Sequence, residues 1–110
     1  MEDVAANRAS FEVIADLFKV FSDATRLSIL QSLKAGPLTV GQLVEHLGMT
    51  QANISKHLKI LADARILRRT KEGTSVYYEI DDDFIFPLCE IVCDKLVRDS
   101  QAKVPFDFSI

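Results

Sequence analysis

The sequence predicts a mainly α-helical fold with one small β-hairpin, and three observations carry that prediction. Segments before residue 65 have apolar residues three and four positions apart, which is the spacing of amphipathic helices. Two short segments rich in β-branched and aromatic residues then flank a glycine-containing turn, as in a hairpin. A final apolar segment returns to helical spacing.

Length and composition indicate one globular domain. The chain has 110 residues, of which 48% are apolar and 26% charged, as is ordinary for a protein with a single core. We expect a folded domain over residues 1–101 and an irregular tail over 102–110. The polar start, MEDVAANRAS, is no signal peptide, and no apolar run approaches the roughly 18–20 residues that span a bilayer. We therefore expect a cytoplasmic protein without a membrane partner.

The first two helices are defined by their apolar spacing. One is expected over residues 8–21, with Phe11, Ile14, Leu17, Phe18 and Phe21 on a single face. Ser22 is expected to cap the next helix, which ends at Gly36-Pro37. The inward positions of that second helix are Leu27, Ile29, Leu30 and Leu33.

Two further helices are expected to meet at a sharp corner. Thr39 can cap a short helix that stops at Gly48, and Thr50 can cap a longer one that ends near residue 64. Glycine at Gly48-Met49 permits the tight turn between them, which is the pattern of a helix-turn-helix. Their inward positions are Leu43, Leu47, Ile54, Leu58 and Leu61.

The remaining elements are a hairpin and a long final helix. Strands are expected at residues 66–70 and 74–80, separated by Lys71-Glu72-Gly73. Asp83 can cap the final helix over residues 84–101. The predicted architecture is therefore a winged helix-turn-helix, with about five helices and a two-stranded wing.

The outward face of the helix after the corner is polar or small, as a helix that enters a DNA groove must be. Gln and Ser hydrogen-bond base edges, Lys reaches guanine or phosphate, and Ala contacts the thymine methyl group. For His57, a phosphate contact and a hydrogen bond within the protein fit equally well. The alternative for the whole face is a helical hairpin that is merely solvated. The candidate DNA-binding residues of this helix are Thr50, Gln51, Ala52, Ser55, Lys56, His57 and Lys59.

The hairpin supplies basic residues beside that helix. Residues 51–75 hold six basic residues against Asp63 and Glu72, a charge of +4, whereas residues 1–50 carry −2 and residues 76–110 carry −5. A basic segment between acidic ends fits binding of a polyanion. The alternative is that these charges only protect a sheet edge from pairing. The candidate DNA-binding residues of the hairpin are Arg68, Arg69, Lys71, Gly73 and Thr74.

The last helix is apolar on nearly all sides, which one small domain cannot bury. Such a surface is usually an oligomer contact, and the first helix is expected to join it. A homodimer that binds an inverted-repeat operator in double-stranded DNA follows from this prediction. The apolar residues of the last helix are Phe84, Ile85, Phe86, Leu88, Ile91, Val92, Leu96 and Val97.

Three stretches together resemble the arsenical-repressor-like (ArsR/SmtB) family of bacterial regulators: SDATRLSILQSL, LTVGQLVEHLGMTQANISKHLKILADARIL and RRTKEGTSVYYEI. The resemblance covers about residues 11–98. It implies a dimeric winged helix whose first and last helices form the interface, and repression that is relieved when an inducer or metal binds. Within the first stretch, Asp23 and Arg26 are expected to be structural, as a helix cap or ion pair.

The chain departs from this family at the positions of two known metal sites. Arsenic-responsive members have two cysteines flanking one residue at the start of the third helix, where this chain has Thr39 and Gly41. Zinc-responsive members carry ligands on the last helix, where only the first of the matching positions is retained. We therefore expect neither site to be present. The four matching positions on the last helix are Asp82, Phe84, Lys95 and Arg98.

Cys89 and Cys93 are the remaining candidates for a sensor. At a spacing of four the two sulfurs lie on one face of the last helix. Thiolates suit soft metals and metalloids, and paired thiols suit oxidation or reactive sulfur chemistry. The alternative is that both cysteines are small hydrophobic packing residues. A family member with no metal or thiol sensor therefore stays open, and no cofactor is assigned.

Two function classes remain. The sequence contains no Gly-rich phosphate loop, no nucleophilic triad context and no HExxH pair, so we expect no enzymatic activity. The favoured function is a sequence-specific DNA-binding transcriptional regulator, a repressor released by an inducer. The alternative is a winged-helix module for protein–protein interaction, and a DNA gel shift separates the two.

Overall fold

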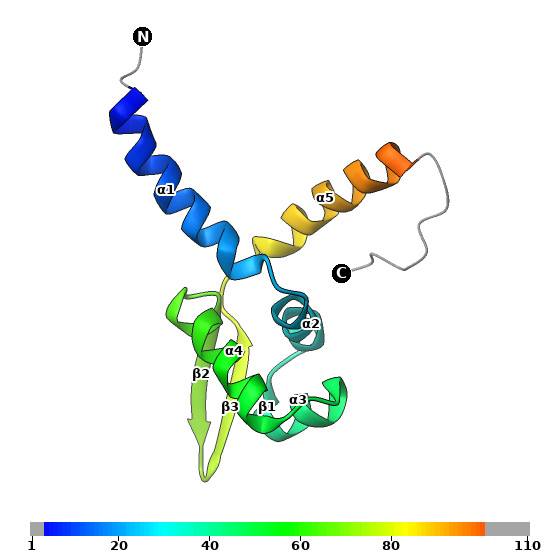
Figure 1. Ribbon diagram of the computed structural model, residues 1–110. Helices are drawn as coiled ribbons and strands as arrows, with labels where there is room; N and C mark the ends of the chain where they lie inside the picture. Colours follow the sequence, from blue (N-terminus) through cyan, green and yellow to red (C-terminus); the bar gives the residue numbers. More distant parts are fainter. Residues whose placement is uncertain (1–3, 101–110) are drawn as a thin grey trace.

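A computed structural model describes residues 4–100 and contains the five helices in the predicted order (Figure 1). The elements are α1 (Val4–Phe21), α2 (Ala24–Leu33), β1 (Leu38–Thr39), α3 (Val40–Leu47), α4 (Gln51–Asp63), β2 (Leu67–Glu72), β3 (Ser75–Ile80) and α5 (Ile85–Ser100). The expected tail at 102–110 lies outside the described residues. Within residues 4–100, none of the helices combines the length and the hydropathy that a membrane span requires.

The core forms where α2, α3 and α4 pack together and against the sheet. Ile29, Leu43 and Ile54 are completely buried, one from each of these helices. These positions were expected to point inward, so the apolar spacing predicted this core correctly. We call the unit formed by α2, α3, α4 and the sheet the body. The core cluster comprises Phe21, Ile29, Leu30, Leu33, Leu43, Ile54, Leu58, Leu61, Ile66, Leu67 and Ile85.

Three of the expected helix-end residues are confirmed. The Thr39 hydroxyl accepts from the Gln42 amide while the Gln42 side chain accepts from the Thr39 amide, which completes a capping box. Gly48 ends α3 with φ +65°, a left-handed conformation that favours glycine. Thr50 caps α4 by accepting from the Asn53 amide.

Two expected caps are wrong by one residue each. Asp23, not Ser22, caps α2, because its carboxylate accepts from the Arg26 amide at 3.0 Å, whereas the Ser22 hydroxyl donates back to the Phe18 carbonyl. Asp82, not Asp83, accepts from the Phe84 amide at the start of α5. In each case neighbouring residues are both good caps, and the local backbone selects one.

The hairpin is longer than predicted and the sheet has a third strand. Lys71 and Glu72 belong to β2, and Glu72 pairs with Ser75, so the turn is Gly73-Thr74 rather than residues 71–73. Gly73 has φ +62°, as two-residue hairpin turns that open with glycine require. The short strand β1 adds to the outer edge of β3, which gives the order β1-β3-β2 instead of a two-stranded wing. A two-residue strand has too little pattern to be seen in sequence.

The end of α4 fixes how the hairpin leaves it. Arg65 adopts φ +62°, and the Ile66 amide donates to the Leu61 carbonyl at 3.0 Å. The Arg65 amide donates to the Ala62 carbonyl, which completes a Schellman motif with arginine where glycine is usual. Ile66 and Leu67 then enter the core and hold β2 against α4.

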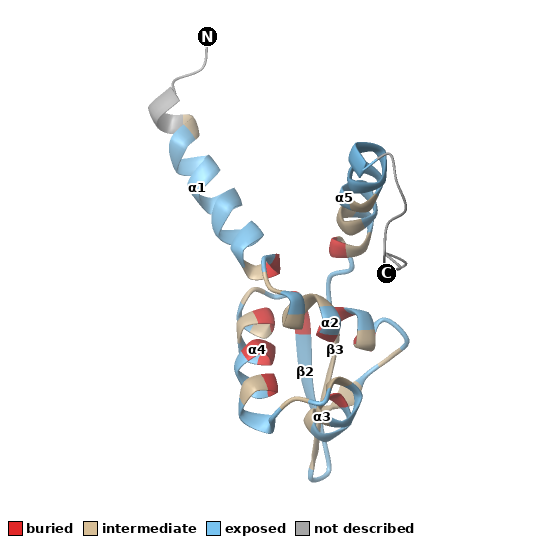
Figure 2. Cartoon of the chain, turned by 45° about the vertical axis from the view of Figure 1, so that its right-hand side comes forward, coloured by how far each residue is buried: buried red, intermediate tan, exposed pale blue. Residues whose placement is uncertain are grey.

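Helices α1 and α5 project from the end of the body opposite the hairpin tip (Figures 1 and 2). α1 starts at Val4 and is therefore longer than predicted, whereas the expected final residue of α5, Gln101, lies outside the described residues. Apart from their junction with the body, both helices are largely exposed (Figure 2). The exposed large hydrophobic residues are Phe11, Val13, Ile14, Leu17 and Phe18 on α1 and Ile91, Val92, Leu96 and Val97 on α5.

Candidate nucleic-acid interface

The polar face of α4 points away from the core. Ile54, Leu58 and Leu61 hold the opposite face in the core with no measurable exposure. The tight turn at Gly48 places the start of α4 at the end of the body that also carries the hairpin tip (Figure 1). An exposed polar helix flanked by a tight turn has the shape that enters a major groove. The exposed residues at the start and along this face are Thr50, Gln51, Ala52, Ser55, Lys56 and Lys59.

His57 does not belong to that face. Its side chain is buried, with 7% of the residue exposed, and its Nδ1 lies 3.1 Å from Nη1 of Arg26. Of the two alternatives that the sequence left open, the hydrogen bond within the protein is the one present, and the assignment of His57 as a DNA-binding residue is corrected. At 100° per residue, position 57 falls beside Ile54 and Leu61 and turns into the core.

The two lysines of α4 differ in whether an acidic side chain pairs with them. Lys59 pairs with Asp63 at 2.9 Å, one turn further along the helix. Lys56 has no acidic partner among the described residues and is exposed. Because a surface ion pair is weak and easily replaced, Lys59 stays available to phosphate, but Lys56 carries the uncompensated charge.

The basic residues of β2 separate onto two faces of the sheet. Side chains alternate along a strand, and Leu67 is buried beneath α4, so Arg69 and Lys71 share the face on the α4 side. Both are exposed and have no ion-pair partner within residues 4–100. Arg68 points to the other face, where its guanidinium bonds Glu79 at 2.7 Å and Asp81 at 3.0 Å.

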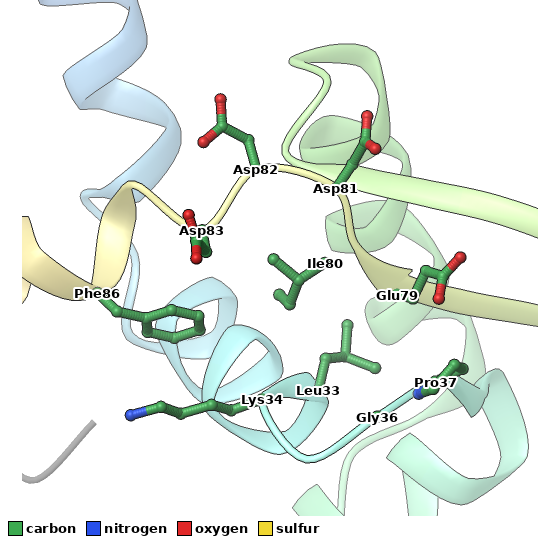
Figure 3. A pocket seen from close by; sticks show the side chains of 10 residues that line it. All are labelled: Leu33, Lys34, Gly36, Pro37, Glu79, Ile80, Asp81, Asp82, Asp83 and Phe86. Carbon is green, nitrogen blue, oxygen red and sulfur yellow. The ribbon is translucent and has the colours of Figure 1, made fainter.

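Acidic residues gather at the end of the hairpin that is remote from its tip. A pocket of about 550 Å³ lies between the end of α2, β3 and the start of α5 and is edged by Glu79 and Asp81–Asp83. Figure 3 shows the side chains that line it. The hydrogen bond and charge pairing with Glu79, followed by the charge of Asp81, raise the pKa of Arg68 further above its ordinary value. Arg68 is thus held by the acidic end, whereas Lys56, Arg69 and Lys71 have no ion-pair partner within residues 4–100.

Cys89 and Cys93 line an apolar groove between α1 and α5. The groove measures about 460 Å³ and includes Phe18, Val92 and Leu96. Both cysteines are half-buried thiols. Burial, and then the neighbouring Cys93 sulfur, raises the pKa of the Cys89 thiol, so this group is protonated at neutral pH. Such a thiol is a poor nucleophile when alone, but it can still coordinate a soft metal that displaces its proton.

The positions that match the family's two metal sites have other roles here. Thr39 caps α3, Asp82 accepts from the Phe84 amide just before α5, and Lys95 pairs with Asp99. Within residues 4–100 no group of three or more His, Cys, Asp or Glu side chains is placed to hold a metal ion. The acidic residues that edge the pocket of Figure 3 give the molecule an uneven charge distribution, with negative charge near the start of α5.

One contact near this site was not predicted from the sequence. Asp23 was expected to be a cap or an ion-pair partner, and it is the cap of α2. Arg26 was expected to be structural only at its own helix end, yet its side chain reaches His57 on α4. The two residues are 31 positions apart, so no local pattern could have joined them.

The helix-turn-helix with an outward polar helix, beside a hairpin carrying unpaired cations, defines the class: a winged helix-turn-helix DNA-binding protein. Residues 23–69 match the family described as "Bacterial regulatory protein, arsR family". The chain is 40% identical over 83 residues to an uncharacterised HTH-type transcriptional regulator of Methanocaldococcus jannaschii, covering 74% of this chain and 93% of that protein. The chain belongs to the arsR family and is a DNA-binding transcriptional regulator.

Solved structures agree with this assignment. The crystal structure of the AntR antimony-specific transcriptional repressor superposes with a TM-score of 0.69 at 32% identity, covering 92% of this chain and 91% of that one. The solution structure of a homodimeric winged helix-turn-helix DNA-binding domain from Mycobacterium bovis has a TM-score of 0.69 at 25% identity, with coverage of 94% and 92%.

Proposed function

We propose that this protein is a homodimeric repressor in the prokaryotic cytoplasm, which binds an inverted-repeat operator and is released by a thiol-directed inducer. One observation carries the DNA-binding part. The start of α4, with its exposed polar side chains, and the hairpin tip next to Lys71 lie at one end of the body, remote from the acidic residues near α5 (Figure 1). A duplex approaching that end meets base-reading groups and phosphate-binding charges together.

The proposed homodimer is supported by the exposed apolar faces of α1 and α5. Phe11 is 63% exposed on α1 and Ile91 is 65% exposed on α5, and both helices carry further large hydrophobic residues in contact with solvent. Patches of this kind usually mark an interface. The structurally similar Mycobacterium bovis domain is a homodimer. A two-fold dimer requires half-sites about one helical turn, or roughly 34–36 Å, apart.

Base recognition is assigned to Gln51, Ala52, Ser55 and Lys56. Gln51→Ala or Ser55→Ala is expected to weaken the operator by roughly 1–3 kcal/mol and to relax preference at one base step, because each removes a hydrogen bond to a base edge. Competition binding against operators with single base-pair changes measures this. Gln31→Ala, exposed on α2, is the matched control. Unchanged specificity in both α4 variants would contradict the recognition-helix assignment.

Phosphate binding is assigned to Arg69 and Lys71, with Gly73 and Thr74 at the wing tip and Lys59 contributing less. Arg69→Ala is expected to weaken all DNA sequences alike and to reduce the magnitude of the salt slope by about one per protomer. Arg68→Ala is the matched control on the same strand, and we expect it to change affinity less because Glu79 and Asp81 already neutralise that guanidinium. Titrations at several salt concentrations measure both slopes. Equal losses in the two variants would show that the ion pairs do not set which arginine binds.

The inducer part rests on the two cysteines in the groove between α1 and α5. A ligand that bridges Cys89 and Cys93 there would act on the helices assigned to the dimer contact, and so on the separation of the two α4 helices. A soft metal, a metalloid or reactive sulfur fits two thiols. The similar AntR protein is an antimony-specific repressor, which favours a metalloid. If DNA binding itself proved absent, a protein–protein interaction module would replace this proposal.

A further inference from the structure

A single side chain, Arg26, connects three helices. Its Nε donates to the Val20 carbonyl at 2.6 Å and its Nη2 donates to the Lys19 carbonyl at 3.2 Å, both at the end of α1. Its Nη1 lies 3.1 Å from Nδ1 of His57 on α4, while its own backbone belongs to the first turn of α2. All three nitrogens of the guanidinium therefore make a polar contact.

The chemistry of this contact specifies which atom accepts. A guanidinium only donates hydrogen bonds, so Nδ1 of His57 is the acceptor for Nη1 of Arg26. The carboxylate of Asp23 accepts from the Arg26 amide and lies 4.0 Å from His57 Nδ1. Positive charge at the carbonyl end of α1 is also favoured by the helix dipole. Each of the three guanidinium nitrogens of Arg26 thus has an acceptor within hydrogen-bond distance.

The position of this contact gives it mechanical leverage. α1 has 18 residues, so it is about 27 Å long, and a rotation of about 10° at its base moves its far end by about 5 Å. That displacement exceeds the rise of one base pair, roughly 3.4 Å. α1 otherwise packs on the body mainly through α2. The carbonyl–guanidinium–imidazole chain is therefore a direct link from α1 to the recognition helix.

We propose that Arg26 and His57 are positioning residues that fix the angle between α1 and α4, and thereby determine which half-site spacing the dimer accepts. The inference rests on the proposed function, in which α1 contributes to the dimer contact and α4 reads DNA. Neither residue touches DNA in this scheme. Lysine at position 26 keeps the charge but cannot hold three acceptors in a planar fork. Phenylalanine at position 57 keeps an aromatic ring but removes the acceptor.

The test compares wild type with Arg26→Lys, His57→Phe and the conservative variant His57→Asn, whose side-chain oxygen can replace Nδ1 as acceptor. Affinities are measured for the best operator, for operators with one or two base pairs added or removed between half-sites, and for a single half-site. We expect Arg26→Lys and His57→Phe to reduce spacing discrimination at least fivefold, with half-site affinity within twofold of wild type. His57→Asn is expected to retain most of the discrimination. Unchanged discrimination, or equal loss for half-site and full operator, would overturn the proposal.

A second measurement does not depend on DNA. Spin labels at Ala9→Cys on α1 and Asp63→Cys on α4, both exposed positions, are introduced with Cys89 and Cys93 changed to serine. We expect His57→Phe to broaden or shift the distance distribution between the labels, and His57→Asn to leave it near that of the parent. An identical distribution in His57→Phe would overturn the inference. If no operator binding were found at all, the proposed function would fail, while this measurement would still decide the role of Arg26 and His57.

Discussion

Replacing Leu96 by glutamate is expected to convert the protein to a monomer and to lower operator affinity by about 10³-fold. Leu96 is 45% exposed and lines the groove between α1 and α5 with Phe18 and Val92. In a two-fold interface every substitution occurs twice, so two carboxylates would be buried in an apolar contact without partners. A monomer then binds one half-site only and loses the multivalent gain, which is typically about 10²–10⁴-fold.

Sedimentation at micromolar concentration reports the change in mass, and gel shifts on the full operator report the loss of affinity. Arg98→Glu is the matched control, because it also places a glutamate on α5 but about 200° further around the helix from Leu96. This control should stay dimeric. A dimeric Leu96→Glu variant with normal operator binding would show that the exposed faces of α1 and α5 serve another purpose.

Changing both Cys89 and Cys93 to serine is expected to leave operator binding intact and to abolish the response to the inducer. The expected size of that response is the roughly 5–150-fold loss of DNA affinity that a coupling of about 1–3 kcal/mol produces. An undistorted helix does not readily accept a disulfide between positions i and i+4. A bridging metal, metalloid or sulfur chain, or a bond to the partner's thiols, is therefore the expected form of the signal.

The pH dependence distinguishes the kinds of bridging ligand. The raised pKa of Cys89 keeps its thiol protonated at neutral pH, so a cation such as Cd²⁺ must displace that proton to bind. Its affinity should rise with pH, by about tenfold per pH unit for each proton released. Arsenous or antimonous acid instead releases its hydroxyl groups, which leave with the thiol protons as water, so its affinity should be nearly independent of pH.

Operator binding is measured with reduced protein, with protein loaded with Cd²⁺, arsenite or antimonite, and with persulfide-treated protein. The single variants Cys89→Ser and Cys93→Ser show whether both sulfurs are needed. If the double variant responds as wild type does, the cysteines only pack in the groove. If wild type responds to none of these agents, the family member uses a different signal or none.

The local patterns of the sequence determined most of the body and the location of the candidate interface. Helix spacing predicted Ile54, Leu58 and Leu61 as core residues, because burial of one face requires their repeat of three and four. Thr39, Gly48 and Thr50 were identifiable because caps and left-handed turns depend on residues within one turn of the helix end. Adjacent alternatives, such as Ser22 and Asp23, were not separable by that chemistry alone.

Tertiary structure alone decided which charged and polar groups remain available. Arg68 and Arg69 are neighbours of the same type, but strand alternation places Glu79 and Asp81 against the first and leaves the second without an ion-pair partner within residues 4–100. His57 lies on the buried side of α4, and the group that hydrogen-bonds its Nδ1 there is a guanidinium 31 residues away on another helix. Strand β1 exists because β3 offers an open edge beside it. Each outcome depends on contacts between segments distant in the chain, and the physical cause is the pairing of buried or charged groups that only the folded structure brings together.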